Sequence, residues 1–287
     1  MGASPSRIMK TDQAEKARKF LALHKGPKTL LLPNAWDVAS ARIFEEAGFP
    51  AIATTSAGVA NSLGYPDGQH IRPDEMLEVV RRIAEAVSVP VTADMEAGYG
   101  QTPEEVAATA GGVLEAGAVG MNLEDTIEER PDSLADLSLQ KERIRAILEV
   151  TRSAGILLVL NARSDVILAG VGEPATRAQR TIERLEAYRE AGAQSLFAPG
   201  VKDKETIAQL VRGVHGPLNI LATAGTPPIA ELEKIGVARV SLGSGPMRAT
   251  MALVARIACQ LREEGTYSLF TDGAITYTEA NRLFEKR

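Results

Sequence analysis

Residues 89–105 read VPVTADMEAGYGQTPEE, and this stretch predicts a strand, a turn and a helix in immediate succession. The β-branched residues at its start are typical of a short buried strand. Two glycines, Gly98 and Gly100, then allow the backbone to turn without obstruction from side chains. Thr102 and Pro103 mark the start of the helix, as its N-cap and its first residue.

Two carboxylates, Asp94 and Glu96, lie at the carboxyl end of this predicted strand. Residues i and i+2 of an extended segment point to the same side, so both side chains are expected to face one cavity. Neighbouring carboxylates repel each other unless a cation lies between them. Mg²⁺ prefers oxygen ligands, and the pair therefore indicates a magnesium site. An acidic loop that only caps the next helix is the alternative.

The same alternation of strand and helix recurs along the chain after a lead-in helix over residues 11–24. The predicted strands are residues 30–33, 51–55, 89–92, 120–124, 156–161, 195–198, 218–221 and 239–242. Eight strand–helix units predict an α/β fold, the (β/α)8 TIM barrel. A doubly wound sheet is the alternative, but no GxGxxG motif follows an early strand. We expect one barrel domain over residues 1–287, with 265–287 as a C-terminal extension.

Composition narrows the class of protein. The chain has 287 residues, 45% of them hydrophobic, which is enough to bury a large core. A net charge of −5 without a block of lysines or arginines argues against nucleic acid and anionic membrane surfaces as partners. A single cysteine, Cys259, excludes an internal disulfide and a cysteine-based zinc site. No signal peptide or membrane-spanning run is apparent, so we expect a cytoplasmic protein.

Polar residues end four neighbouring strands of the predicted barrel. Active sites of such barrels lie at the carboxyl ends of the strands. The residues found there are Thr54, Thr55 and Ser56, then Asp94 and Glu96, then Glu124 and Asp125, and finally Arg163. Charges gathered at one barrel mouth are costly when they are uncompensated. A bound metal together with an anionic substrate would offset that cost.

Four motifs resemble the isocitrate lyase/phosphoenolpyruvate mutase superfamily, in its order and on the corresponding strands. They are ATTSAG at 53–58, DMEAGYG at 94–100, LED at 123–125 and NAR at 161–163. The resemblance extends over about residues 30–261. It implies a barrel enzyme that uses Mg²⁺, or alternatively Mn²⁺, on a small 2-oxo acid. It also implies a homo-oligomer, a dimer of dimers in which the last helix, 246–264, is swapped between subunits.

The resemblance also implies roles for individual residues. Metal binding falls to Asp94, Glu96 and Glu124, and catalysis to Arg163, Glu124 and Asp67. Substrate binding falls to Thr54, Thr55, Ser56, Ala57, Gly58 and Arg163. A lyase or phosphonomutase-like reaction would break a C–C or P–C bond at C3 of a 2-oxo acid or substituted malate. The electrons left behind form an enolate, which a Lewis acid stabilises. For Asp67, a plain Pro-Asp-Gly turn is the alternative.

Departures from the family bear on the substrate. Glu96 stands where the family usually has a second aspartate, and residues 126–134 lack the cysteine and histidine of the isocitrate lyase loop. In the same loop, Arg130 and Asp132 replace the lysine and asparagine of the phosphonomutase branch. An oxaloacetate decarboxylase-like or substituted-malate lyase-like reaction is therefore favoured over isocitrate lyase. A loop is predicted over residues 56–72, after the second strand, and His70 within it is interpreted as a surface residue.

Two other functions stay open at this point. Glycine-rich segments at 224–227 and 243–245 precede helices, which suits a phosphate site in a phosphosugar isomerase or aldolase. A non-catalytic protein that binds a 2-oxo acid is the second alternative, because the cysteine acid is missing.

Overall fold

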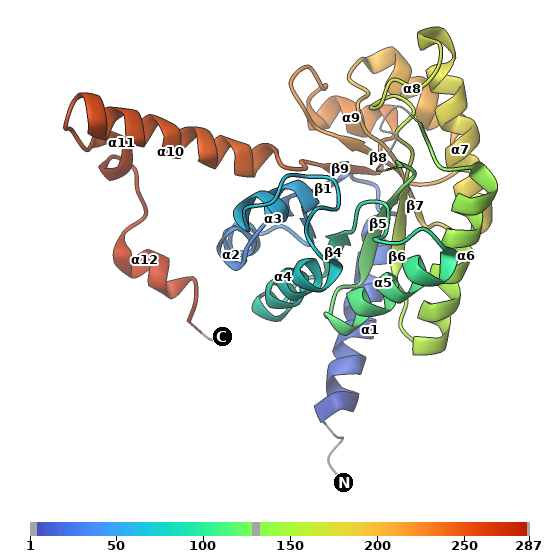
Figure 1. Cartoon of the computed structure of the whole chain (residues 1–287), viewed down its shortest axis with the longest axis horizontal. Helices are drawn as coiled ribbons and strands as arrows, with labels where there is room; N and C mark the ends of the chain where they lie inside the picture. The colour runs from blue at the N-terminus through green and yellow to red at the C-terminus, as the bar shows by residue number, and fades with distance from the viewer. Residues whose placement is uncertain (1–4, 128–132, 286–287) are drawn as a thin grey trace.

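The computed structural model describes residues 5–127 and 133–285, with only the backbone described for residues 5–10. Within these ranges, parallel strands form one sheet in the order β1-β9-β8-β7-β6-β5-β4-β3-β2, curled into a nearly closed barrel with helices outside it (Figure 1). The strands are β1 (Leu30–Leu32), β2 (Asn34–Ala35), β3 (Ile52–Thr54), β4 (Val91–Asp94), β5 (Gly120–Glu124), β6 (Val159–Arg163), β7 (Ser195–Ala198), β8 (Leu218–Leu221) and β9 (Arg239–Ser241). The predicted TIM-like barrel is confirmed.

Helices alternate with the strands along the chain. Those before β5 are α1 (Pro5–Leu23), α2 (Val38–Glu46), α3 (Ser56–Ser62), α4 (Pro73–Ala86) and α5 (Pro103–Glu115). Those between β5 and β9 are α6 (Leu137–Ala154), the 3-10 turn η1 (Pro174–Thr176), α7 (Arg177–Ala191), α8 (Lys204–Gly213) and α9 (Ile229–Ile235). The chain then continues into α10 (Gly245–Glu263), α11 (Ser268–Thr271) and α12 (Tyr277–Arg282).

The first predicted strand, residues 30–33, corresponds to β1, and a second short strand, β2, follows it directly. The break between them brings the two ends of the sheet together. Pro33 separates β1, which pairs with β9, from β2, which pairs with β3. Proline has no backbone N–H to donate to a sheet. Its carbonyl oxygen still accepts from the backbone N of Ala53 at 2.9 Å, so the chain changes neighbour here without leaving the barrel wall.

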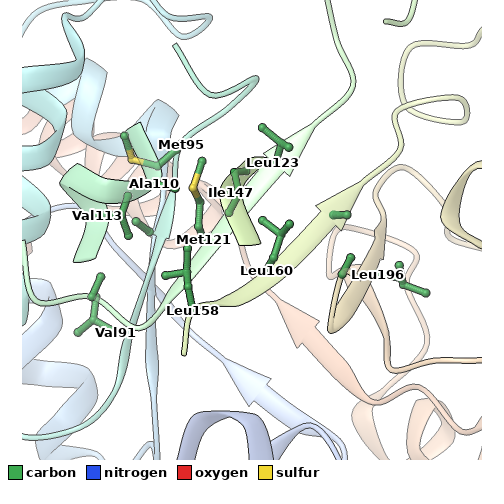
Figure 2. Packing of buried hydrophobic residues seen from close by; sticks show 14 of the residues in the cluster. Val91, Met95, Ala110, Val113, Met121, Leu123, Ile147, Leu158, Leu160 and Leu196 are labelled. Carbon is green, nitrogen blue, oxygen red and sulfur yellow. The ribbon is translucent and has the colours of Figure 1, made fainter. Parts of the chain in front are cut away.

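Alternate side chains of the central strands point outward into a hydrophobic layer beneath the helices. Met121 and Leu123 point outward from β5 and pack with residues of α5 and α6. Figure 2 shows this outer layer through Val91, Met95, Ala110, Val113, Met121, Leu123, Ile147, Leu158, Leu160 and Leu196. The intervening residues, Asn122 and Glu124, therefore belong to the barrel interior, since side chains alternate along a strand.

A smaller hydrophobic cluster lies between α1 and the strands. Ala17 and Phe20 of α1 are fully buried against Leu32, Ala53 and Val159. The predicted lead-in helix thus contributes a second hydrophobic core that supports the barrel strands.

The segment after β3 begins as a helix, which corrects the expectation of a loop over residues 56–72. The Thr55 side chain caps α3 by accepting from the backbone N of Gly58 at 3.3 Å. A side chain at position 58 would clash, because its Cβ would lie 2.5 Å from Cγ2 of Thr55 and 3.0 Å from Cβ of Trp36. Glycine therefore lets α3 start directly at the barrel mouth.

The C-terminal part of the chain forms an arm. Helix α10 projects away from the barrel, and the chain then returns so that α12 lies to the left of α2 in the view of Figure 1. Arg42 of α2 donates from Nε to the carbonyl oxygen of Leu283 at 2.6 Å, which ties the end of the arm to the barrel. Among the described residues, we find no helix whose length and apolar character would suit a bilayer span.

Candidate active site

Acidic residues surround a pocket at the carboxyl ends of the strands. Its volume is about 430 Å³, a size that suits a small ligand. The lining residues are Asp67, Gly68, Gln69, His70, Glu96, Glu124, Thr126, Ile127, Asp165, Leu168 and Ala169. A larger pocket of about 830 Å³ adjoins it and shares Gln69, Thr126 and Ile127.

Asp94, at the end of β4, is held in place through both carboxylate oxygens. Oδ2 accepts from the backbone N and the Oγ of Ser56 at 3.1 and 2.9 Å. Oδ1 accepts from Nδ2 of Asn122 at 3.1 Å. The backbone N of Asp94 donates to Oγ1 of Thr54 at 2.9 Å, so the neighbouring strand β3 fixes this residue as well.

Glu96 adopts a left-handed backbone, with φ 51°, and two neighbours that contact it do the same: Gln69 at φ 59° and Tyr99 at φ 54°. The Glu96 carboxylate accepts from the backbone N of Gln69 at 2.8 Å and from the Tyr99 hydroxyl at 3.2 Å. The Gln69 side chain accepts from the backbone N of Tyr99 at 2.7 Å. Such backbones cost about 1–3 kcal/mol each and gather at functional sites.

Burial and mutual repulsion raise the proton affinity of these acids. Burial, together with the charges of Asp67 and Asp94, raises the pKa of Glu96 to about 7. Asp67 lies on the exposed β3–α4 loop, where partial desolvation by the surrounding protein and the charge of Asp94 raise the pKa of its carboxyl. The carboxylates therefore face one another without enough positive charge between them.

Arg163, at the end of β6, lies between two carboxylates. Its Nη1 is 2.6 Å from Oε2 of Glu124, and its Nε and Nη2 donate to the two oxygens of Asp165 at 2.6 and 2.7 Å. The guanidinium also lies 5.6 Å from the ring centre of Phe197. Burial lowers the pKa of Arg163, but the charges of Glu124 and Asp165 outweigh that effect and raise it overall.

Glu124 lies as close to Arg163 as Asp165 does, and its carboxyl binds a proton more readily than an ordinary glutamate. Burial raises the pKa of its carboxyl to about 8, although the charge of Arg163 acts in the opposite direction. Its Oε1 accepts from the Thr126 hydroxyl at 2.6 Å. A carboxyl group with a pKa close to the working pH is suited to proton transfer.

The chemistry of these donors fits a hard divalent cation. Oxygen ligands from Asp94, Glu96 and Glu124 are those that Mg²⁺ prefers, and a cation would relieve the repulsion that raises the pKa values of Glu96 and Asp67. In the described ranges, no three His, Cys, Asp or Glu side chains lie close enough together to ligate one ion directly.

The five predicted substrate-binding residues around the start of α3 differ in their contacts. Thr54 and Ser56 bond to Asp94, and Thr55 caps the helix. Ala57 is half-buried, and Gly58 packs against Trp36 and Thr55. The contacts of Thr54 and Ser56 thus link this segment to β4.

Asp125 does not lie with the other acids, although the strand-end pattern grouped it with Glu124. The structure buries it completely on the outer side, where Oδ2 accepts from Nε of Arg184 and the hydroxyl of Tyr188, both at 2.7 Å. Its Oδ1 accepts from the backbone N of Asp165 at 2.8 Å. Successive residues of a strand face opposite sides, and this separates the two neighbouring carboxylates.

Other residues of the site were missed or misjudged from the sequence. Asp165 follows Arg163 by two residues, and that spacing was the signal that could have identified it. Gln69 bonds to Glu96 from another loop, a contact that no local pattern indicates, and Tyr99 bonds to Glu96 within the same turn. His70, interpreted as a surface residue, is exposed but lines the acidic pocket. Arg130 and Asp132 lie outside the described residues.

The proposed phosphate segment after β9 has its amides engaged elsewhere. The backbone N atoms of Leu242 and Gly243 donate to Oδ1 of Asn34 at 2.8 and 2.9 Å. Asn34 is buried, and its Nδ2 donates to the carbonyl oxygen of Thr54 at 2.8 Å. This arrangement disfavours a phosphosugar site, because a phosphate needs free N–H donors.

Comparisons with known proteins bear on the family of the chain. A model of the phosphoenolpyruvate phosphomutase family matches residues 20–262. The chain is 30% identical to 2-methylisocitrate lyase of Escherichia coli K12, over 85% of this chain and 83% of that protein. A solved structure of a lyase/mutase-type protein from Burkholderia cenocepacia J2315 is 37% identical, with a TM-score of 0.90, and covers 96% of this chain and 98% of its own. The structure of 2,3-dimethylmalate lyase is 26% identical, with a TM-score of 0.82, and covers 93% and 94%.

Proposed function

Since the chain belongs to the phosphoenolpyruvate phosphomutase family, whose relatives here include lyases, we propose that it is a Mg²⁺-dependent lyase. Its substrate would be a 2-oxo acid or a substituted malate, cleaved at C3. The single observation that carries this proposal is the acidic pocket in which Glu124 and Arg163 are 2.6 Å apart, beside Glu96 and Asp165.

We assign the metal to Asp94, Glu96 and Glu124. Glu96 and Glu124 would act through metal-bound water, because no three acids of the described residues lie close enough together to ligate one ion directly. When bound, Mg²⁺ would supply Lewis-acid stabilisation for the negative charge that develops on a keto oxygen. The acids around the pocket outnumber Arg163, and an anionic substrate would be repelled unless a cation were present. Mn²⁺ offers similar chemistry and is the expected substitute.

Arg163 would bind the anionic part of the substrate and stabilise the enolate that bond cleavage leaves. Its guanidinium is already oriented by Asp165, so little reorganisation would be needed as charge develops. Glu124 would exchange the proton, since its pKa of about 8 lies near neutrality. Asp67 would contact the substrate from the β3–α4 loop, and residues 54–58 would contribute backbone N–H groups.

The residues that line the acidic pocket indicate which substrate, and therefore which bond, is favoured. Leu168, Ala169 and Ile127 form an apolar part of the pocket, which would tolerate an alkyl group at C3. An apolar wall offers a phosphonate no partner for its charge. We therefore favour a substituted malate or oxaloacetate over a phosphonate as substrate, in agreement with the name of the relative 2,3-dimethylmalate lyase.

Side-by-side NMR assays of oxaloacetate, 2,3-dimethylmalate and phosphonopyruvate test the proposal. Each substrate is incubated with Mg²⁺ or with EDTA, and Glu124→Gln serves as the inactive control. Product formation that needs Mg²⁺ and disappears in the variant supports the lyase proposal and names the leaving group. Turnover in EDTA would contradict it, and binding of a 2-oxo acid without turnover would favour the non-catalytic alternative.

We further propose that the protein is a homo-oligomer in which α10 packs on a neighbouring copy. Within the single chain α10 projects from the barrel and exposes Met251, Leu253, Val254 and Leu261. Apolar surface of this kind is normally covered. Light scattering would give the mass of a dimer or tetramer, and Val254→Glu would lower it. A monomeric wild-type protein would refute this proposal.

A further inference from the structure

A line of hydrogen bonds crosses the barrel interior and ends at Asp94. Oγ of Ser195 donates to Oδ1 of Asn161 at 2.7 Å, and Nδ2 of Asn161 donates to Oδ1 of Asn122 at 2.8 Å. Nδ2 of Asn122 then donates to Oδ1 of Asp94 at 3.1 Å. We call Ser195, Asn161 and Asn122 the amide ladder. Its members are 0%, 0% and 6% exposed, so water does not reach them from outside.

The strand register brings the ladder together. Asp94 pairs with Asn122, Asn122 pairs with Asn161, and Asn161 pairs with Ser195, on the adjacent strands β4, β5, β6 and β7. Neighbouring strands lie about 4.8 Å apart, so side chains at one level meet across each gap. Long apolar residues at these positions would fill the interior, but they would leave Oδ1 of Asp94 without its donor.

The charge of Asp94 dictates the direction of every bond in the ladder. An ionised carboxylate only accepts, so Asn122 must turn its Nδ2 toward Asp94 and its Oδ1 toward Asn161. Asn161 must then donate to Asn122, which leaves its own Oδ1 for the Ser195 hydroxyl. All three donors thus point toward the carboxylate, and hydrogen bonds aligned in this way polarise one another.

We infer that Asn122, Asn161 and Ser195 are positioning residues that orient the Asp94 carboxylate for metal binding, from as far away as β7. This inference rests on the proposed function, because Asp94 is taken as a metal acid. Ser56 donates to Oδ2 of Asp94 from the side of β3, so the ladder and Ser56 hold the two carboxylate oxygens from opposite sides of β4. Residues that orient metal ligands typically contribute 10–100-fold to metal affinity.

The barrel interior offers a matched control. Asn219 and Ser241, on β8 and β9, are 0% and 3% exposed and bond to each other at 3.3 Å. Asn219 therefore resembles Asn161 in burial and in having a serine partner, while the ladder runs from Asn161 toward Asp94. Replacing either asparagine by leucine removes a buried amide of similar size.

Mn²⁺ binding to the full chain, without substrate, tests the inference. Electron paramagnetic resonance gives the free Mn²⁺ during a titration, and urea unfolding gives the stability of each variant. We expect Asn161→Leu to weaken Mn²⁺ binding about 10-fold or more, whereas Asn219→Leu leaves it within about 2-fold of wild type. In an Asn122→Leu background, Asn161→Leu should cause little further loss, because the ladder is already broken.

A second pair of variants, with smaller changes of side chain, tests the inference if the leucine variants do not fold. Ser195→Ala should weaken Mn²⁺ binding several-fold, and Ser241→Ala should not. Equal Mn²⁺ affinity in wild type, Asn161→Leu and Ser195→Ala would overturn the positioning role and leave the proposed function intact. A wild-type protein that binds no Mn²⁺ at millimolar concentration would overturn the metal role of Asp94 itself, and with it both proposals.

Discussion

The adjacent acids Glu124 and Asp125 should respond in opposite ways to loss of charge. Asp125 is fully buried, and the structure assigns it to holding α7 and the segment around Asp165 against the barrel. Glu124 is the proposed catalytic acid beside Arg163. The informative change is therefore Asp125→Asn, with Glu124→Gln as the matched control.

The expected loss of stability follows from the contacts that Asp125→Asn removes. Asparagine keeps one oxygen for the three donors, and it replaces the charge that pairs with Arg184 by an amide. Removing one partner of a buried ion pair costs about 3–5 kcal/mol. Because Arg184 is partly open to solvent, we expect the lower end, about 3 kcal/mol, which lowers Tm by roughly 6–12 °C. Glu124→Gln should cost less than about 1 kcal/mol, since Arg163 keeps its two hydrogen bonds to Asp165.

Urea unfolding followed by circular dichroism measures both variants, and the NMR assay measures their turnover. We expect Asp125→Asn to lose stability while the folded fraction stays active, and Glu124→Gln to keep stability and lose activity. In an Arg184→Met background, Asp125→Asn should cost clearly less than it does alone, because the pair is already broken. The reasoning is refuted if Asp125→Asn is as stable as wild type and inactive.

Three further outcomes are expected elsewhere in the chain. Arg239 is fully buried, and none of its side-chain nitrogens has a hydrogen-bond partner in the described structure. Arg239→Met should therefore raise the free energy of unfolding, measured in urea, by about 1–4 kcal/mol. A loss of stability would show that the guanidinium has a stabilising partner. Burial, with the charge of Arg239, lowers the pKa of His24 from 6.5 to about 4. At His24 the folded state then binds fewer protons than the unfolded chain. The free energy of unfolding of the wild type, measured relative to His24→Asn, should therefore fall by about 3 kcal/mol as the pH drops from 6.5 to 4. Gly98 has φ +95°, and a Cβ there would lie 2.7 Å from Cγ1 of Val106. Gly98→Ala should therefore lower the free energy of unfolding by about 1–3 kcal/mol. An unchanged urea midpoint would mean that the turn relaxes.

Local pattern was enough to predict most of the scaffold. The alternation of short apolar runs with amphipathic segments predicted the barrel, because burial of parallel strands under helices leaves that trace in the sequence. The same local reasoning located Asp94, Glu124 and Arg163 at strand ends, where the structure finds them. Glu96 was expected to continue the extended segment, but it lies two residues beyond β4 with φ 51°. The metal, the substrate and the roles of these residues stay predictions.

Contacts between distant segments could be identified only from the tertiary structure. Which of Glu124 and Asp125 faces the pocket depends on the register of β5 between its neighbours, and a shift by one residue would exchange them.

What the sequence alone determined is therefore the set of elements and the chemical groups at their ends, since both follow from spacing along the chain. What only the tertiary structure decided is how those groups meet: the left-handed contacts of Gln69 and Tyr99 with Glu96, the change of partner at Pro33, and the alignment of Asn122, Asn161 and Ser195. The physical reason is that register and loop contacts join residues tens of positions apart, and the packing of the whole barrel fixes them.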